Sequence, residues 1–167
     1  MDSRLYQLQG EAEVVVSGQL TVIALGSNQG DRHAHLSYAV SKLSVILSNL
    51  RVSSFTETCP EGVDPQPQFL NGVVVGDYVG SPTLLMATLR RIEDYRGRTR
   101  PYQGAPRTLD LDLIVMGDIV IDDGLLKVPH PRFRIRRFVL EPLVAVAPEL
   151  VDPISGQTMR ELLDALP

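Results

Sequence analysis

The sequence predicts an α+β domain whose core elements follow the order β-α-β-β-α-β. Two amphipathic segments alternate with four short, β-branched apolar runs, a pattern typical of helices packed on a sheet. A proline-rich loop, and not a helix, joins the second run to the third. We therefore expect these two strands to pair antiparallel and both helices to cover one face of the sheet. This order predicts a ferredoxin-like sandwich, with an added hairpin strand and C-terminal helices.

The first two predicted elements are a strand and a helix. Residues 20–25 (LTVIAL) are apolar and β-branched, which predicts a buried strand, and residues 26–30 (GSNQG) predict the turn that ends it. Asp31 then offers an N-cap to a helix. Apolar residues at helical spacing predict that this amphipathic helix runs from Arg32 to about Leu50.

The next two predicted elements are strands that enclose a loop. Residues 52–58 and 69–79 are predicted strands, and the three prolines and one glycine of residues 59–68 predict the loop between them. Gly72 and Gly76 interrupt the second of these strands. We expect bulges or close backbone approaches at both glycines.

The C-terminal half begins with a second helix. Ser81 and Pro82 provide an N-cap followed by proline at the first helical position, and the helix is expected to continue to about Tyr95. Residues 97–107 are polar and basic and predict a loop. The remaining predicted elements are a strand over residues 108–116, its hairpin partner over residues 119–121, and helices over residues 137–147 and 159–166.

Length and composition predict one globular domain. The chain has 167 residues, 44% of them hydrophobic and 22% charged, which is enough for a buried core. Residues 1–19 are expected to form a weakly ordered extension and residues 20–167 a single domain. No apolar run approaches the roughly 18 residues of a membrane span, and the one cysteine, Cys59, permits no internal disulfide. We therefore expect a cytoplasmic protein without a membrane partner. The chain is also expected to be a monomer.

Charge is distributed unevenly along the chain. The net charge is −4, but residues 90–137 carry +4 and the remainder −8, and ten of the fourteen arginines lie in this window. An acidic chain argues against a protein that binds nucleic acid without sequence preference, and against one that binds anionic membranes. A segment rich in arginine favours a localised anion site, because guanidinium pairs with phosphate through two hydrogen bonds. The alternative is a solvated surface rich in arginine.

Asp110 and Asp112 are the clearest chemical signal in the sequence. Residues two apart on a strand point to the same face, so the two carboxylates are expected about 6–7 Å apart on an open face, opposite Leu111. Such a pair requires a cation, an arginine or a shared proton, and Mg²⁺ commonly binds one or two carboxylates together with phosphates. A solvated strand face is the alternative, although aspartate is rare inside strands.

Basic residues flank the acid pair on both sides. Arg98, Arg100 and Arg107 precede it, and His130 and Arg136 follow it. This arrangement predicts a site for a metal–polyphosphate complex, in which positioning and electrostatics suffice for phosphoryl transfer. The other arginines of the segment that follows are interpreted as field or surface charges: Arg132, Arg134 and Arg137.

Five short segments follow one another in the order of a known family. In chain order they are residues 23–28 (IALGSN), 69–71 (FLN), 106–113 (PRTLDLDL), 128–132 (VPHPR) and 136–143 (RRFVLEPL). In this order they resemble the 6-hydroxymethyl-7,8-dihydropterin pyrophosphokinase family of the folate pathway. The resemblance implies an enzyme that transfers the β,γ-pyrophosphoryl group of ATP to the hydroxymethyl oxygen of the pterin and releases AMP, with two Mg²⁺ ions.

The resemblance also implies roles for individual residues. Asp110 and Asp112 would hold the metal ions, and Arg98 and Arg100 would act in catalysis by closing over the phosphates. The ATP-binding residues that the family implies are Glu93, Arg100, Arg107, His130 and Arg136. The pterin-binding residues that it implies are Thr58, Asn71 and the two aromatic residues that would enclose the ring, Phe69 and Phe138.

The sequence departs from the family pattern in the loop before Pro106. Many members carry Arg-Trp in this stretch, where the present chain has residues 101–105 (PYQGA). Tyr102 is the aromatic residue available as a substitute.

Other functions are compatible with part of the sequence. RNA-recognition domains share the β-α-β-β-α-β order, but they place stacking aromatics on the face where we expect the acid pair. A Mg²⁺-dependent nuclease could use the same two aspartates. Single residues also have plainer interpretations: Phe69 and Phe138 as core aromatics, and Glu93 as a helix-surface partner of Arg90 or Arg96. We expect ATP and the pterin, and no nucleic acid, as partners.

Overall fold

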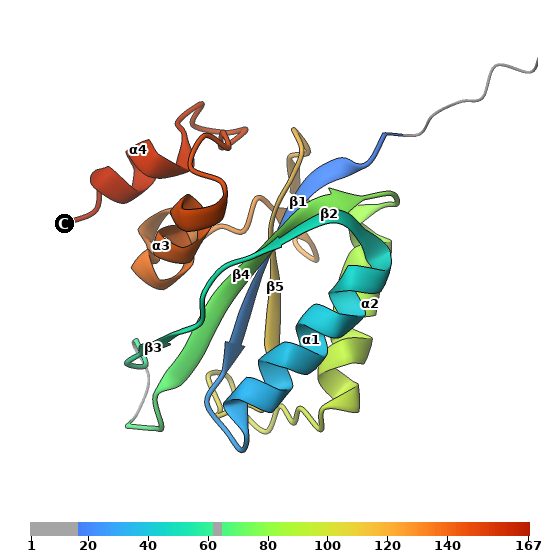
Figure 1. The fold of residues 1–167 in the computed structure, drawn as a ribbon, viewed down its shortest axis with the longest axis vertical. Helices are drawn as coiled ribbons and strands as arrows, with labels where there is room; N and C mark the ends of the chain where they lie inside the picture. The colour runs from blue at the N-terminus through green and yellow to red at the C-terminus, as the bar shows by residue number, and fades with distance from the viewer. Residues whose placement is uncertain (1–16, 62–64) are drawn as a thin grey trace, which may run out of the picture.

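The computed structural model describes residues 17–61 and 65–167 (Figure 1). The extension predicted over residues 1–19 lies outside the described residues up to residue 16, and Gln19 already begins the first strand. The five strands of the main sheet are β1 (Gln19–Ser27), β2 (Leu47–Val52), β3 (Thr56–Thr58), β4 (Phe69–Tyr78) and β5 (Asp110–Met116). The helices are α1 (Arg32–Ile46), α2 (Pro82–Tyr95), α3 (Arg137–Val146) and α4 (Met159–Asp164), with a 3-10 turn at Phe133–Ile135.

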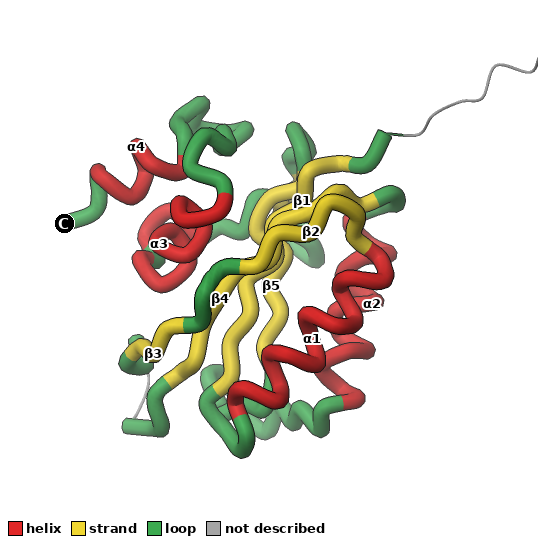
Figure 2. Tube along the Cα trace, in the orientation of Figure 1, coloured by secondary structure: helices red, strands yellow, loops and turns green. Residues whose placement is uncertain are grey.

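The sheet is antiparallel, with the strand order β2-β4-β1-β5 and β3 added beside β4. Helices α1 and α2 lie on one face, and α3 and α4 lie on the other (Figures 1 and 2). The antiparallel pairing across the proline-rich loop and the shared face of the two long helices are thus confirmed. In the described part of the chain, no helix is both long enough and apolar enough to cross a membrane.

Two apolar clusters fill the two sides of the sheet. The cluster beneath α1 and α2 contains Leu111 and Leu113, and the cluster beneath α3 contains Ile114 and Phe133. Leu111 and Leu113 thus face one cluster and Ile114 the other, as expected. The alternation ends there, because Ile114 and Val115 both belong to the second cluster, beside an irregularity in the pairing of β5 with β1.

The face of the sheet opposite α1 and α2 was expected to be open. This expectation is wrong, because α3 and the 3-10 turn cover that face with apolar side chains. At the beginning of β5, a cavity lined in part by Phe138 and Val139 of α3 separates this cover from the acid pair.

The first helix is shorter than its periodicity predicts. It ends at Ile46, and β2 begins at Leu47, which pairs with Tyr78 of β4. Apolar residues spaced four apart fit a helix, but here ladder hydrogen bonds to β4 determine the conformation. The predicted strand over residues 52–58 is divided, because β2 ends at Val52 and β3 begins at Thr56.

The predicted hairpin partner of β5 is wrong. Strand β6 (Ile121–Asp122) pairs with β7 (Lys127–Val128) in a separate two-stranded sheet. The chain leaves β5 at Gly117, whose positive φ of 50° and hydrogen bond to Leu20 O (2.8 Å) direct it away from the free edge. Strand β5 therefore remains at the edge of the main sheet.

Candidate active site

Asp110 and Asp112 lie at the start of β5, where the sheet has small residues beside them. Asp110 is opposite Gly26, and Asp112 is opposite Ala24. A Cβ at Gly26 would lie 2.8 Å from Asn71 Oδ1, so only glycine leaves this space open. The two carboxylates therefore face a hollow in which neighbouring strands contribute little side-chain bulk.

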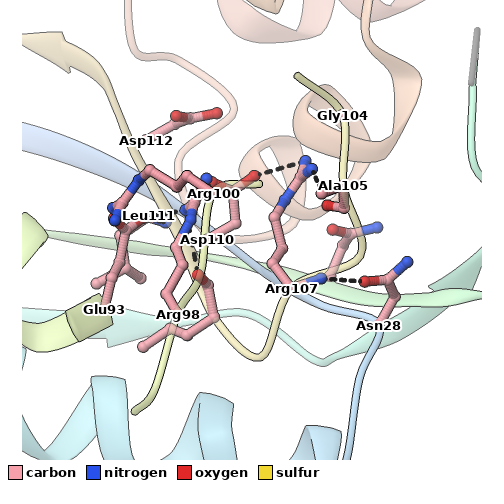
Figure 3. Close-up of polar contacts among 12 residues, drawn as sticks. Asn28, Glu93, Arg98, Arg100, Gly104, Ala105, Arg107, Asp110, Leu111 and Asp112 are labelled. Carbon is pink, nitrogen blue, oxygen red and sulfur yellow. Dashed lines mark hydrogen bonds and ion pairs between the residues drawn. The ribbon is translucent and has the colours of Figure 1, made fainter. Parts of the chain in front are cut away.

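Two arginines contact Asp110 directly (Figure 3). Arg98 Nη1 lies 2.5 Å from Asp110 Oδ1, and Arg107 Nη2 lies 2.8 Å from Asp110 Oδ2. Both oxygens are thus paired, and the side chain of Asp110 is only 19% exposed. These two arginines come from the loop over residues 97–107, which places predicted phosphate-binding groups against a predicted metal ligand.

Asp112 has looser partners and is the more exposed of the pair, at 36% of its side chain. Arg136 Nη1 lies 3.7 Å and His130 Nε2 lies 3.8 Å from Asp112 Oδ2. Burial and the nearby Asp110 carboxylate raise the pKa of Asp112 to about 6, although Arg136 opposes this shift.

His130 is held in its neutral form. Burial and the neighbouring Arg136 lower the pKa of His130 to about 4. Its Nδ1 accepts a hydrogen bond from the Arg132 amide at 3.1 Å, so the proton of the neutral ring is on Nε2. His130 consequently presents an N–H donor, and not a cation, on the side of Asp112.

Glu93, near the end of α2, is buried with 4% exposure. Its Oε1 accepts hydrogen bonds from Leu111 N at 2.7 Å and from Arg98 Nη1 at 2.5 Å, and its Oε2 accepts from Arg100 Nη2 at 2.6 Å. The interpretation as a helix-surface partner is therefore wrong. Burial raises the pKa of Glu93 to about 7, although Leu111 N–H and Arg98 oppose the shift.

A cavity of about 330 Å³ opens beside the acid pair. Its lining includes most residues that the resemblance assigns to the site: Thr58, Phe69, Asn71, Arg98, Arg107, Asp110, Asp112, Arg136 and Phe138. Its lining does not include Glu93, Arg100 or His130. Tyr102 is 65% exposed and does not line the cavity either.

Several further lining residues were not predicted for the site, because loops bring them there. Glu61, Gln66, Gln103 and Gly104 come from the loops over residues 59–68 and 97–107, and Arg132 from the segment before α3. The sequence-based interpretation of Arg132 as a field or surface charge therefore misses its place at the cavity. The prolines and glycines that mark these segments as loops predict no direction for their side chains.

Asn28 is the residue that joins these loops. It is 1% exposed, its Oδ1 accepts from Arg107 N at 2.8 Å, and its Nδ2 donates to Gln66 Oε1 at 2.7 Å. Gln66 Nε2 in turn donates to Gly104 O at 3.2 Å. The only sequence signal for this role is the GSN motif, which predicts a turn and no longer-range contact.

Arg134 is not a free surface charge. Its Nε and Nη2 each donate to Asp152 at 2.6 Å, and Asp152 is fully buried. Burial alone would raise the pKa of Asp152, but hydrogen bonds from Arg134 and Ser155 lower it to about 2. This pair joins the segment before α3 to the turn before α4, outside the cavity.

The chain is similar to known proteins of one family. A family model described as 7,8-dihydro-6-hydroxymethylpterin-pyrophosphokinase (HPPK) matches residues 22–148. The chain is 40% identical over 145 residues to the 2-amino-4-hydroxy-6-hydroxymethyldihydropteridine pyrophosphokinase of Synechocystis sp., which covers 86% of this chain and 74% of that protein. It is also 40% identical over 145 residues to the Bacillus subtilis protein of the same name, which covers 85% of this chain and 87% of that protein.

Solved structures show the same fold at low sequence identity. Wild-type HPPK-DHPS of Plasmodium falciparum matches with a TM-score of 0.69 and 15% identity over 88% of this chain. An HPPK-DHPS in complex with substrates matches with a TM-score of 0.73 and 12% identity over 90% of this chain. The chain spans less than half of these two solved chains, 44% and 43% respectively.

Proposed function

The chain belongs to the 7,8-dihydro-6-hydroxymethylpterin-pyrophosphokinase family, and we propose that it transfers pyrophosphate from ATP to the hydroxymethyl group of 6-hydroxymethyl-7,8-dihydropterin. AMP and the pterin diphosphate are the products, and the reaction is a step of folate biosynthesis. One observation supports the proposal above all: the acid pair and four arginines line the same cavity as Asn71 and two aromatic rings. The strand order β2-β4-β1-β5 supports assigning the core as ferredoxin-like.

The donor set at Asp110 and Asp112 fits Mg²⁺. Within residues 17–61 and 65–167, no group of three or more His, Cys, Asp or Glu side chains could hold a metal ion. Mg²⁺ needs no such group, because it commonly takes one or two carboxylates and completes its octahedron with water and phosphate oxygens. When bound here, two such ions would neutralise phosphate charge and orient the triphosphate.

The arginines of the loop over residues 97–107 fit an anionic substrate. Arg98 Nε and Arg107 Nε are buried and have no hydrogen-bond partner within the described part of the chain. Unpaired buried N–H groups are destabilising, and a phosphate oxygen would satisfy them. We infer that these two arginines and Arg136 bind the phosphates of ATP, with Arg98 and Arg107 leaving Asp110 as they do so. Arg100, which is 47% exposed, would join them from the same loop.

Aromatic and amide groups form the proposed pterin site. Asn71 is 7% exposed and donates to Thr58 Oγ1 at 2.6 Å, so its amide is held in one orientation for the pterin edge. Arg107 Cζ lies 5.0 Å from the centroid of the Phe69 ring, and Arg136 Cζ lies 5.5 Å from that of Phe138. A pterin stacked on these rings would thus lie beside the phosphate-binding arginines, where its hydroxymethyl oxygen can attack the β-phosphorus.

Three of the residues assigned to ATP lie outside the cavity lining: Glu93, Arg100 and His130. The neutral His130 would donate through Nε2 to a phosphate oxygen near Asp112, whereas Glu93, which pairs with Arg98 and Arg100, would not contact ATP itself. A monomeric state and a cytoplasmic location remain predictions.

The proposed activity is tested by AMP release. Protein, ATP and Mg²⁺ should form AMP only when the reduced hydroxymethylpterin is added, and the pterin should gain the mass of a diphosphate. AMP at the same rate without the pterin would contradict the proposal. A salt-dependent shift of RNA, or Mg²⁺-dependent cleavage of RNA or DNA, would instead support one of the two alternative functions.

A further inference from the structure

The free edge of β5 is occupied by groups that belong to no strand. Leu111 N donates to Glu93 Oε1 at 2.7 Å, and Leu109 O accepts from Arg98 Nη1 at 3.1 Å. Further along the same edge, Ile114 O accepts from His130 N at 2.8 Å. In a longer sheet, a neighbouring strand would satisfy these backbone groups. Here three residues that the resemblance assigns to the site satisfy them instead.

We propose that Glu93 is a positioning residue, which holds Asp110 and Asp112 in place by accepting the backbone hydrogen bond of Leu111. The proposal rests on the proposed function only in taking these two aspartates as the metal ligands. Glu93 is not proposed to touch ATP or the metal.

The position of Leu111 explains how Glu93 would act on both aspartates. Its N–H belongs to the peptide that links Leu111 to Asp110, and its carbonyl belongs to the peptide that links it to Asp112. A buried acceptor oxygen at 2.7 Å fixes the plane of the first peptide, and hence the directions in which both side chains leave the strand. Removing a group that orients a metal ligand, without itself binding the metal, commonly weakens metal binding by about 10- to 100-fold.

Glu93 is itself held, so that it can serve as a fixed acceptor (Figure 3). Its two oxygens accept from Arg98 and Arg100 at 2.5 and 2.6 Å. It is 4% exposed, and water therefore has little access to replace it at Leu111 N–H. When Arg98 moves to a phosphate, Glu93 Oε1 still accepts from Leu111.

A different role for Glu93 would depend on its charge and not on its acceptor atom. The carboxylate could serve only to neutralise Arg98 and Arg100. The two roles separate in Glu93→Gln, because glutamine keeps an acceptor oxygen but has no charge. Glu93→Ala removes both. Asp94→Asn is the matched control, since the exposed Asp94 accepts from Arg100 at 3.0 Å at the same end of α2 and, among the described residues, forms no hydrogen bond or ion pair with β5.

The test measures two properties in each full-length variant without substrate. Amide hydrogen exchange reports whether Leu111 N–H is protected, and titration with Mn²⁺, followed by the electron paramagnetic resonance of the free ion, reports affinity at the acid pair. In Glu93→Ala we expect faster exchange at Leu111 and about 10- to 100-fold weaker Mn²⁺ binding. In Glu93→Gln and Asp94→Asn we expect both properties to stay at the wild-type level.

Three results would overturn the proposal. In the first, Glu93→Ala has the wild-type exchange rate at Leu111 or the wild-type Mn²⁺ affinity. In the second, Glu93→Gln loses as much amide protection and Mn²⁺ affinity as Glu93→Ala. In the third, Asp94→Asn weakens Mn²⁺ binding as much as Glu93→Ala does. If thermal unfolding shows that Glu93→Ala is not folded, the test rests on Glu93→Gln. The proposal then requires that Leu111 N–H stay protected in this variant and that the variant bind Mn²⁺ with wild-type affinity. Absence of AMP formation by the wild type would contradict the proposed function and leave these two measurements unaffected.

Discussion

Arg98 Nη1 lies 2.5 Å from Asp110 Oδ1, so a proposed phosphate-binding group is paired with a proposed metal ligand. Arg107 occupies the other oxygen of the same carboxylate at 2.8 Å. A cation that binds Asp110 would therefore compete with these two arginines for the same carboxylate oxygens. A displaced guanidinium is then free to pair with the phosphates that accompany the metal.

Replacing Arg98 should separate metal binding from activity. In Arg98→Met, Mn²⁺ should bind about five- to tenfold more tightly without nucleotide, because a competing cation is removed from a partly exposed pair. AMP formation with the pterin should nevertheless fall, because a phosphate-binding group is lost. Arg90→Met, on an exposed residue of α2, is the control and should change neither quantity. Weaker Mn²⁺ binding in Arg98→Met would show that the ion pair prepares the site and does not compete with the metal.

Each aspartate of the acid pair should be essential for pyrophosphoryl transfer. Asp110→Asn and Asp112→Asn keep the volume of the side chain but remove the charge that holds the metal, and kcat should fall at least about a hundredfold. Initial rates of AMP release at saturating ATP measure the effect, and thermal unfolding verifies that each variant folds. Activity close to the wild-type rate in both variants would refute the metal assignment.

Asp152 should make the stability of the fold depend on pH in acid. Its pKa is about 2 in the folded protein, below the ordinary value of 3.8. A lowered folded pKa adds stability that is present above pH 4 and is lost as the pH falls toward 2. At pH 7, Asp152→Asn should lower the free energy of unfolding by about 1–2 kcal/mol, a value reduced because Arg134 is partly exposed.

Urea unfolding at pH 7, 4 and 2.5 tests this dependence. The difference between the wild type and Asp152→Asn should narrow at the lowest pH, whereas Asp164→Asn, on an exposed residue of α4, should follow the wild type throughout. A difference that stays constant over this range would mean that the ionised carboxylate is not the stabilising group.

The single cysteine should report on occupancy of the cavity. Cys59 is exposed and lines the cavity beside Thr58. A bulky maleimide on this thiol should therefore block activity, and the reduced pterin should slow the labelling. Cys59→Ser should remain active and become insensitive to the reagent. Labelling at an unchanged rate with saturating pterin, measured by mass spectrometry, would place the pterin elsewhere.

Local patterns in the sequence determined much of this protein. Alternation in residues 108–113 placed both aspartates on one face of β5 and the leucines on the other, and the structure confirms it. The caps at Asp31 and Ser81 are also as expected, because each side chain accepts a backbone hydrogen bond three residues ahead. These features depend on residues close together in the chain, where spacing and side-chain chemistry suffice to predict them.

Tertiary structure decided the features that depend on what packs against each element. Periodicity specifies which face of its own strand a residue occupies, but not which helix covers that face or which edge of the sheet stays free. For that reason the cover of α3, the free edge of β5 and the buried bond from Leu111 to Glu93 were not predicted. The contacts of Asn28 with Arg107 and Gln66 likewise join residues that only folding brings together.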